Sequence, residues 1–180
     1  MGTSKSKRRV KIVESIASAI SSKKIFDTID YRNRNEDYIK QYMHQPLIKE
    51  LEELYENLEL SKSNDKEIVK QKAKDCLLWE GDVNTTVNNF TFFGTQHRPD
   101  FVVKIDKLSV AVEVKKGETG SSLREGIGQS LVYASAFDFV VYLYVDISKD
   151  KKIRDSMSGE QEQDLINDLW DSHNALFQVV

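Results

Sequence analysis

Apolar side chains recur at three- and four-residue intervals along the first part of the chain. Residues 13–26, 35–60 and 66–81 all have this spacing, which predicts amphipathic helices. Pro46 is expected to separate two helices within the second stretch, because proline disrupts a helix interior. We therefore expect a helical N-terminal extension over residues 1–60.

The periodicity changes after Gly81. Short runs rich in β-branched and aromatic residues follow at 85–94, 100–105 and 109–116, and they predict an antiparallel meander. Next come a helix-like stretch, a nearly continuous apolar run and a closing helix-like stretch, at 122–137, 139–147 and 159–177. A continuous apolar strand reached through a helix belongs at the centre of a sheet that is covered on both faces. The pattern therefore predicts an α/β fold with a mixed sheet, whose core and C-terminal helix lie within residues 61–180.

Composition and charge narrow the class of protein. Hydrophobic residues make up 39% of the chain and charged residues 31%, which is typical of a globular domain. No apolar run approaches the ~20 residues that span a bilayer, and the chain does not start like a secretory signal, so we expect a cytoplasmic protein with no membrane partner. The net charge of −3 argues against indiscriminate coating of nucleic acid. It does not exclude an enzyme whose carboxylates meet phosphate through a divalent cation.

Two charged side chains stand out on the apolar strand at residues 109–116. The strand period of two places Glu113 and Lys115 on one face and the valines on the other. A half-buried sheet favours uncharged packing at such positions, so the charges call for an explanation. Asp100 begins the neighbouring strand, and a turn near Lys107 would bring Asp100 and Glu113 to about the same height.

This pair of carboxylates indicates metal chemistry on phosphate. Oxygen ligands of this kind suit Mg²⁺ or Mn²⁺, which are usually bound by one or two carboxylates together with substrate phosphate. Such an ion polarises a phosphoryl oxygen and lowers the pKa of an attacking water. Lys115 would either orient that water or offset the developing charge.

The same residues resemble a known family. Pro99 and Asp100, followed after a spacer by Glu113, Val114 and Lys115, are similar to the motif of the PD-(D/E)xK nuclease superfamily. The resemblance implies a restriction-endonuclease-like core in the order α-β-β-β-α-β, which matches the expected order of elements. It also implies a metal-dependent nuclease.

The next helix carries a second feature of that superfamily. Gln129 and Tyr133 are four residues apart and share one helix face. They resemble the QxxxY motif of RecB-like nucleases and of type I restriction subunits, which implies that they bind nucleic acid or hold the catalytic lysine. The alternative is a half-buried tyrosine beside a surface glutamine. Lys116 and Arg98 are further candidates for DNA contacts at the edge of the cleft.

Many members of the superfamily take another metal-binding glutamate from a helix before the first strand. Residues 64–81 resemble the corresponding segment of type I restriction subunits, which points to Glu67. Asn64 and Glu67 also form a capping-box pattern, so a role at the helix start stays open, and Glu80 is the substitute candidate. The implied catalytic set is Asp100, Glu113, Lys115 and Glu67, and the implied metal-binding set is Asp100, Glu113, Val114 and Glu67.

The sequence therefore predicts a Mg²⁺- or Mn²⁺-dependent deoxyribonuclease acting in restriction, repair, recombination or phage biology. One alternative is a catalytically silent nuclease fold that binds DNA or protein, and another is an RNA endonuclease of the viral type. The chain contains no phosphate-loop motif for ATP hydrolysis, so a helicase or translocase would be a separate partner. Cutting both strands with one active site per chain would favour a homodimer.

Overall fold

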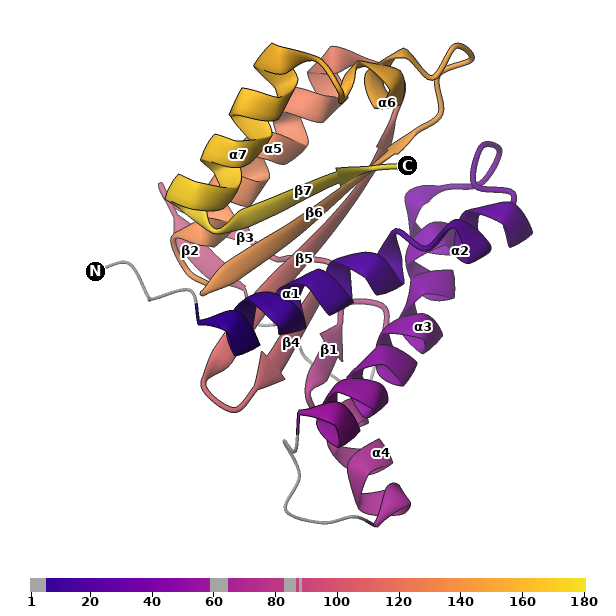
Figure 1. Cartoon of the computed structure of the whole chain (residues 1–180). Coiled ribbons are helices and arrows are strands. Elements are labelled where there is room, and N and C mark those ends of the chain that lie inside the picture. Colours follow the sequence, from indigo (N-terminus) through magenta and orange to yellow (C-terminus); the bar gives the residue numbers. More distant parts are fainter. Residues whose placement is uncertain (1–5, 59–64, 83–86, 88) are drawn as a thin grey trace.

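The computed structural model describes residues 6–58, 65–82, 87 and 89–180. Seven helices and seven strands are assigned within these residues (Figure 1). In chain order they are α1 (Lys7–Ile20), α2 (Lys23–Thr28), α3 (Glu36–Asn57), α4 (Lys66–Asp75), β1 (Leu77–Trp79), β2 (Phe90–Phe92), β3 (Thr95–His97), β4 (Phe101–Ile105), β5 (Leu108–Gly117), α5 (Gly120–Ala134), β6 (Phe139–Asp146), α6 (Lys152–Ser156), α7 (Glu160–His173) and β7 (Ala175–Val179). None of the described helices is both long enough and apolar enough to cross a bilayer.

Five strands form one mixed sheet in the order β1-β4-β5-β6-β7. Strand β4 is antiparallel to both of its neighbours, β1 and β5. Strand β6 is parallel to both of its neighbours, β5 and β7. Helix α5 connects β5 to β6, as expected for a parallel crossover. Every residue of β6 is buried, because its neighbours in the sheet are β5 and β7. The α/β fold with a mixed sheet is therefore confirmed.

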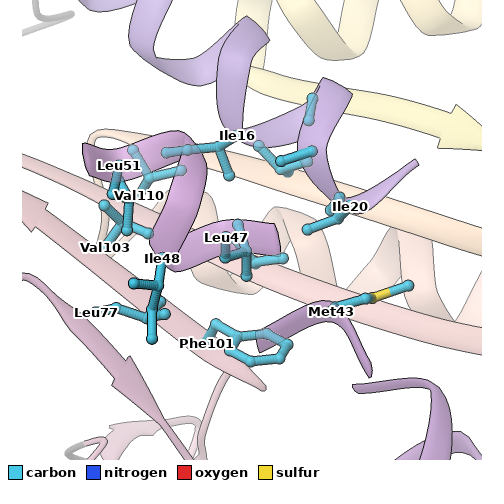
Figure 2. Packing of buried hydrophobic residues seen from close by; sticks show 14 of the residues in the cluster. Ile16, Ile20, Met43, Leu47, Ile48, Leu51, Leu77, Phe101, Val103 and Val110 are labelled. Carbon is cyan, nitrogen blue, oxygen red and sulfur yellow. The ribbon is translucent and has the colours of Figure 1, made fainter. Parts of the chain in front are cut away.

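Helices cover both faces of the sheet (Figure 1). The side chains of Val110, Val112 and Val114 point into the cluster that α1 and α3 complete. Ala111, on the alternate face, belongs to the cluster that includes Tyr133 of α5. Figure 2 shows side chains of α1, α3 and three sheet strands meeting in the first cluster: Ile16, Ile20, Met43, Leu47, Ile48, Leu51, Leu77, Phe101, Val103 and Val110.

The connection between β4 and β5 is as tight as the sequence predicts. Ile105 and Leu108 pair across it, and Asp106 adopts a left-handed backbone conformation with φ 53°. Aspartate tolerates this region better than most residues because its short polar side chain can bond locally. The turn fixes the register of the whole β4–β5 pair, which decides what lies opposite each residue further along.

Pro46 does not separate two helices, contrary to expectation. Helix α3 continues through it from Glu36 to Asn57. An internal proline costs a helix about 3 kcal/mol, but Met43 and Leu47, on either side of it, are both fully buried against the sheet. The apolar packing of this helix face, which includes Met43 and Leu47, outweighs the backbone hydrogen bond that is lost at Pro46.

The prediction that residues 85–94 form the first strand of a meander was also wrong. Leu77–Trp79, expected at the end of a helix, forms β1 and pairs with β4. Phe90–Phe92 instead pairs with Thr95–His97 in a separate two-stranded hairpin. Residues 83–86 and 88, also within or beside the expected strand, lie outside the described residues. A three-residue strand is too short for periodicity to distinguish it from the end of a helix.

The closing helix is shorter than expected. Helix α7 ends at His173, and Asn174 follows in the left-handed conformation that commonly ends helices. Ala175–Val179 then forms strand β7, parallel to β6 at the edge of the sheet. The apolar residues of this segment fit a helix or a strand equally well, and only pairing with β6 decides between them.

Removing buried volume from α3 is expected to destabilise the whole protein. Leu47 is fully buried in the cluster shared by α1, α3 and the sheet. Leu47→Ala should lower the free energy of unfolding by about 2 to 5 kcal/mol, because it leaves a cavity as well as losing apolar contact. The measurement is urea denaturation. Ile68→Ala, at a 43% exposed position, is the control and should change stability by less than about 0.5 kcal/mol.

Candidate active site

Strand β5 continues beyond the start of its neighbour β4. The last pair between them joins Phe101 to Val112. Residues 113–117 of β5 still pair with β6 on one side, but no described strand pairs with them on the other. The backbone groups of β5 on that side therefore need partners from elsewhere.

Two carboxylates provide partners for this free edge. The backbone N–H of Val114 donates to Oδ2 of Asp100 at 2.8 Å, and the N–H of Lys116 donates to Oε2 of Glu36 at 2.9 Å. Asp100 directly precedes β4, whereas Glu36 comes from the first turn of α3. The N–H and C=O of a strand residue point to the same side, so the carbonyl of Val114 faces the same edge as these carboxylates.

The ammonium group of Lys40 links these acidic groups. Its Nζ lies 2.8 Å from Oδ1 of Asp100, 3.1 Å from Oδ1 of Asp37 and 3.8 Å from Oε1 of Glu36. Lys40 is itself buried, and burial alone would lower its pKa. The charge of Asp100 and the hydrogen bond to it outweigh that effect and raise the pKa of Lys40 above its ordinary value. Lys40 is therefore a fixed positive charge beside Asp100.

Glu113 lies at the height of Asp100, on the face of β5 that is turned toward α5. It is only 6% exposed, and its Oε2 atom is buried with no hydrogen-bond partner among the described residues. Burial, followed by the neighbouring charge of Asp100, raises the pKa of Glu113 to about 9. Burial also raises the pKa of Asp100, against the opposing effect of Lys40. The two carboxyl groups thus share a site too poor in positive charge to ionise both.

Lys115 follows Glu113 on the same strand face. Its Nζ lies 3.4 Å from Oε1 of Glu125 on α5, and its side chain is partly exposed. Because the Glu125 side chain is exposed to water, this ion pair is weak. It therefore does not hold the ammonium group of Lys115 firmly in place.

Helix α5 places Tyr133 against the site. The Tyr133 hydroxyl donates to the backbone carbonyl of Arg98 at 3.1 Å. Burial and the nearby carboxyl group of Glu113 raise the pKa of Tyr133. Gln129, one turn earlier on the same face, has a buried Oε1 atom that lacks a hydrogen-bond partner among the residues described. The structure thus brings this helix face next to the carboxylate pair.

The remaining candidate residues have other contacts. Glu67 lies exposed in the first turn of α4, where its N–H donates to the capping side chain of Asp65 at 2.9 Å, while Asn64 is outside the described residues. Arg98 forms an ion pair with Glu80. The ammonium group of Lys116 donates to backbone carbonyls in the segment between α2 and α3. The carboxylate that the structure brings to Asp100 from an upstream helix is Glu36, not Glu67.

Glu36 and Lys40 were not among the expected site residues, although the sequence carries a signal for them. They precede Met43 and Leu47 at intervals of four, three and four residues, so they continue the buried stripe of α3. Charged side chains at core-facing positions are rare unless they are paired. The helical spacing that leads back from Met43 to Lys40 and Glu36 is the sequence signal that identifies them.

A small pocket opens beside Lys40. Its volume is about 220 Å³, and it lies where the first part of α3 meets the end of β1. It is lined by Asp37, Lys40, Trp79, Glu80 and Gly81. The pocket leaves space for a small ligand next to the Lys40–Asp100 pair.

Comparisons with known proteins identify no relative. Protein-family models, curated proteins and solved structures were all searched, and none of them matches the chain. The function must therefore be argued from the site itself.

The raised pKa of Glu113 predicts how the stability of the metal-free protein depends on pH. The folded protein keeps the Glu113 proton up to about pH 9, whereas the unfolded chain releases it near pH 4.5. The free energy of unfolding should therefore fall as the pH rises between these values. Glu113→Gln, which mimics the protonated acid, should show a weaker decline in thermal denaturation across this range. Equal slopes for the two proteins would contradict the assignment.

Proposed function

We propose that the protein is a divalent-metal-dependent nuclease that hydrolyses phosphodiester bonds of DNA. The observation that carries the proposal is the buried pair Asp100 and Glu113. One oxygen of Glu113 has no hydrogen-bond partner among the described residues, and too little positive charge lies nearby to ionise both acids. Buried carboxyl groups whose pKa values are strongly shifted by their neighbours are concentrated at functional sites. A bound cation would remove both the missing contact and the charge repulsion.

The residues present fit Mg²⁺ or Mn²⁺. Both ions prefer oxygen ligands, and the free edge of β5 gathers three sources of oxygen: the carboxylates of Asp100 and Glu113 and the carbonyl of Val114. Glu36, held to the same edge through the N–H of Lys116, is a fourth source or a ligand to a bound water. A divalent ion held there lowers the pKa of an attacking water and polarises the phosphoryl oxygen.

The other side chains act on the substrate. Lys115 donates to the scissile phosphate or to the attacking water, which offsets the negative charge that develops on the phosphoryl oxygens. Lys40 favours the ionised form of Asp100 and holds its carboxyl group in place. Gln129 and Tyr133 bind the adjacent phosphate or orient Lys115 from α5. Lys116 and Arg98 sit at the edges of the same site, where they contact DNA after exchanging their present partners.

The order of elements supports the same proposal. Strands β1, β4 and β5, helix α5 and strand β6 follow one another in the order of the restriction-endonuclease-like core, with the β2–β3 hairpin inserted after the first strand. The residues of the PD-(D/E)xK resemblance lie directly before β4 and in the second half of β5. In this proposal α3, rather than α4, is the helix that supplies the upstream glutamate.

Cleavage assays test the proposed activity. Linear, circular and single-stranded DNA, and RNA, are incubated with Mg²⁺, with Mn²⁺ or with EDTA. We expect metal-dependent cutting of DNA that falls at least about 100-fold in Lys115→Ala, the range in which loss of one charge-stabilising donor reduces rates. Lys104→Ala, an exposed lysine on β4, is the matched control and should cut like the wild type. Undiminished cutting by both Lys115→Ala and Asp100→Ala would refute the proposal.

The choice between Glu36 and Glu67 is tested by metal binding. Mg²⁺ is titrated by calorimetry, and thermal stability is followed in parallel. Glu36→Gln should weaken binding and reduce the stabilisation by Mg²⁺, by roughly tenfold in affinity, whereas Glu67→Gln should leave both unchanged. The reverse pattern would restore Glu67 to the metal site.

The same assays separate the alternatives. Cutting of RNA in preference to DNA would favour the RNA endonuclease. Binding of DNA without metal uptake or cutting would favour a catalytically silent module. Sedimentation on duplex DNA reports whether the protein acts as a homodimer, and added helicase or translocase chains are needed only if the isolated chain binds metal but does not cut.

A further inference from the structure

The β2–β3 hairpin ends in an unusual aromatic tip. Phe93 is 92% exposed, and it has a left-handed backbone conformation with φ 48°, followed by Gly94 with φ 74°. Two consecutive positive φ values mark the tight turn for which asparagine and glycine are the preferred pair. A bulky aromatic residue at the first of these positions is strained. The edge-to-face contact of Phe93 with Phe92 buries little of its side chain, and the turn geometry disfavours phenylalanine, so the residue points to a binding role.

The tip is joined to the candidate active site by a row of aromatic rings. Tyr133 lies 5.9 Å from Phe90, which lies 5.7 Å from His97; His97 is 6.5 Å from Phe92, and Phe92 is 4.5 Å from Phe93, all measured between ring centroids. We call these five residues the aromatic row. It begins at the tyrosine beside Glu113 and ends at the exposed Phe93.

The hairpin also lies close in sequence to Asp100 and carries no negative charge that would repel a polyanion. After β3, only Arg98 and Pro99 precede Asp100. Residues 89–97 contain no acidic side chain, although the whole chain has 29. The paired strands extend from the site by about 10 Å, or roughly three base steps of a nucleic acid strand.

We propose that Phe93 stacks on an unpaired nucleobase of the strand that enters the candidate active site. This inference rests on the proposed nuclease function and extends it to single-stranded segments, as at ends, gaps or flaps. Stacking on aromatic rings suits unpaired bases of any sequence, since every base has a π-face. A base within a duplex would first have to be unstacked, which costs free energy.

Binding measurements with substitutions at Phe93 test the inference. All proteins carry Lys115→Ala to prevent cleavage, and fluorescence anisotropy reports the binding of a labelled single-stranded oligonucleotide in Mg²⁺. Phe93→Asn installs the residue that this turn prefers, so the unfolding free energy should stay the same or rise. Affinity should nevertheless fall by about 5- to 150-fold, the loss of one stacked base. Leu165→Asn, at a 47% exposed position on α7, is the control and should bind normally.

Two further measurements show whether a base is the partner. Phe93→Trp should retain the affinity, and its fluorescence should be quenched on binding, beyond any change from Trp79 and Trp170 in the parent protein. An oligonucleotide with abasic positions should bind the parent and Phe93→Asn equally weakly. Equal affinity of the two proteins for the normal oligonucleotide would overturn the inference.

The failure of this inference is distinguishable from failure of the proposed function. If the protein cuts or binds DNA but Phe93→Asn does so equally well, only the stacking role is wrong. If no nucleic acid is bound or cut, the nuclease proposal fails and the stacking role fails with it. If Phe93→Asn changes self-association in sedimentation but not DNA binding, the tip contacts protein instead, which also overturns the inference.

Discussion

The candidate site exists because β5 is longer than β4. Where β4 begins, the backbone of β5 loses its neighbour on one side, and the N–H groups of Val114 and Lys116 donate to the carboxylates of Asp100 and Glu36 instead. These hydrogen bonds fix Asp100 and Glu36 at one edge, with the carbonyl of Val114 facing the same way. A longer β4 would cover that edge with backbone and leave no room for the acidic group.

The second constraint on the site is the negative charge of its two buried carboxyl groups. Asp100 and Glu113 are both almost fully buried, and the nearest positive group bonded to them is the ammonium of Lys40 on Asp100. No described residue forms an ion pair with Glu113, and burial together with the charge of Asp100 raises the pKa of Glu113 well above its ordinary value. Folding thus places two acids where water cannot stabilise both charges, and this is the feature on which the proposed metal site rests.

Helix α3 connects the core to this site. Its buried stripe, including Met43 and Leu47, packs against α1 and the sheet, while one or two turns earlier the same helix face presents Lys40 and Glu36 to the free edge of β5. The position of the charged pair is therefore set by apolar packing along the rest of the helix. The N-terminal helices belong to the same core cluster as the sheet, and through α3 they also contribute to the site.

The sequence alone determined the alternation on β5 that separates Glu113 and Lys115 from the valines, the turn that aligns Glu113 with Asp100, and the helical spacing of Gln129 and Tyr133. These features depend on local periodicity, which a sequence displays directly. It also predicted, from the continuous apolar run of β6, that this strand lies inside the sheet with a neighbour on each side.

Only the tertiary structure decided which helix reaches the carboxylates. Glu67 and Glu36 are both glutamates near a helix start, and their sequence contexts do not reveal that α3 lies over the free edge of β5 while the first turn of α4 is exposed. Tertiary packing likewise let α3 pass through Pro46, and pairing with neighbouring strands made β1 and β7 from segments whose local pattern also fits a helix. Short segments carry too few residues for periodicity to choose, so long-range contacts make that choice.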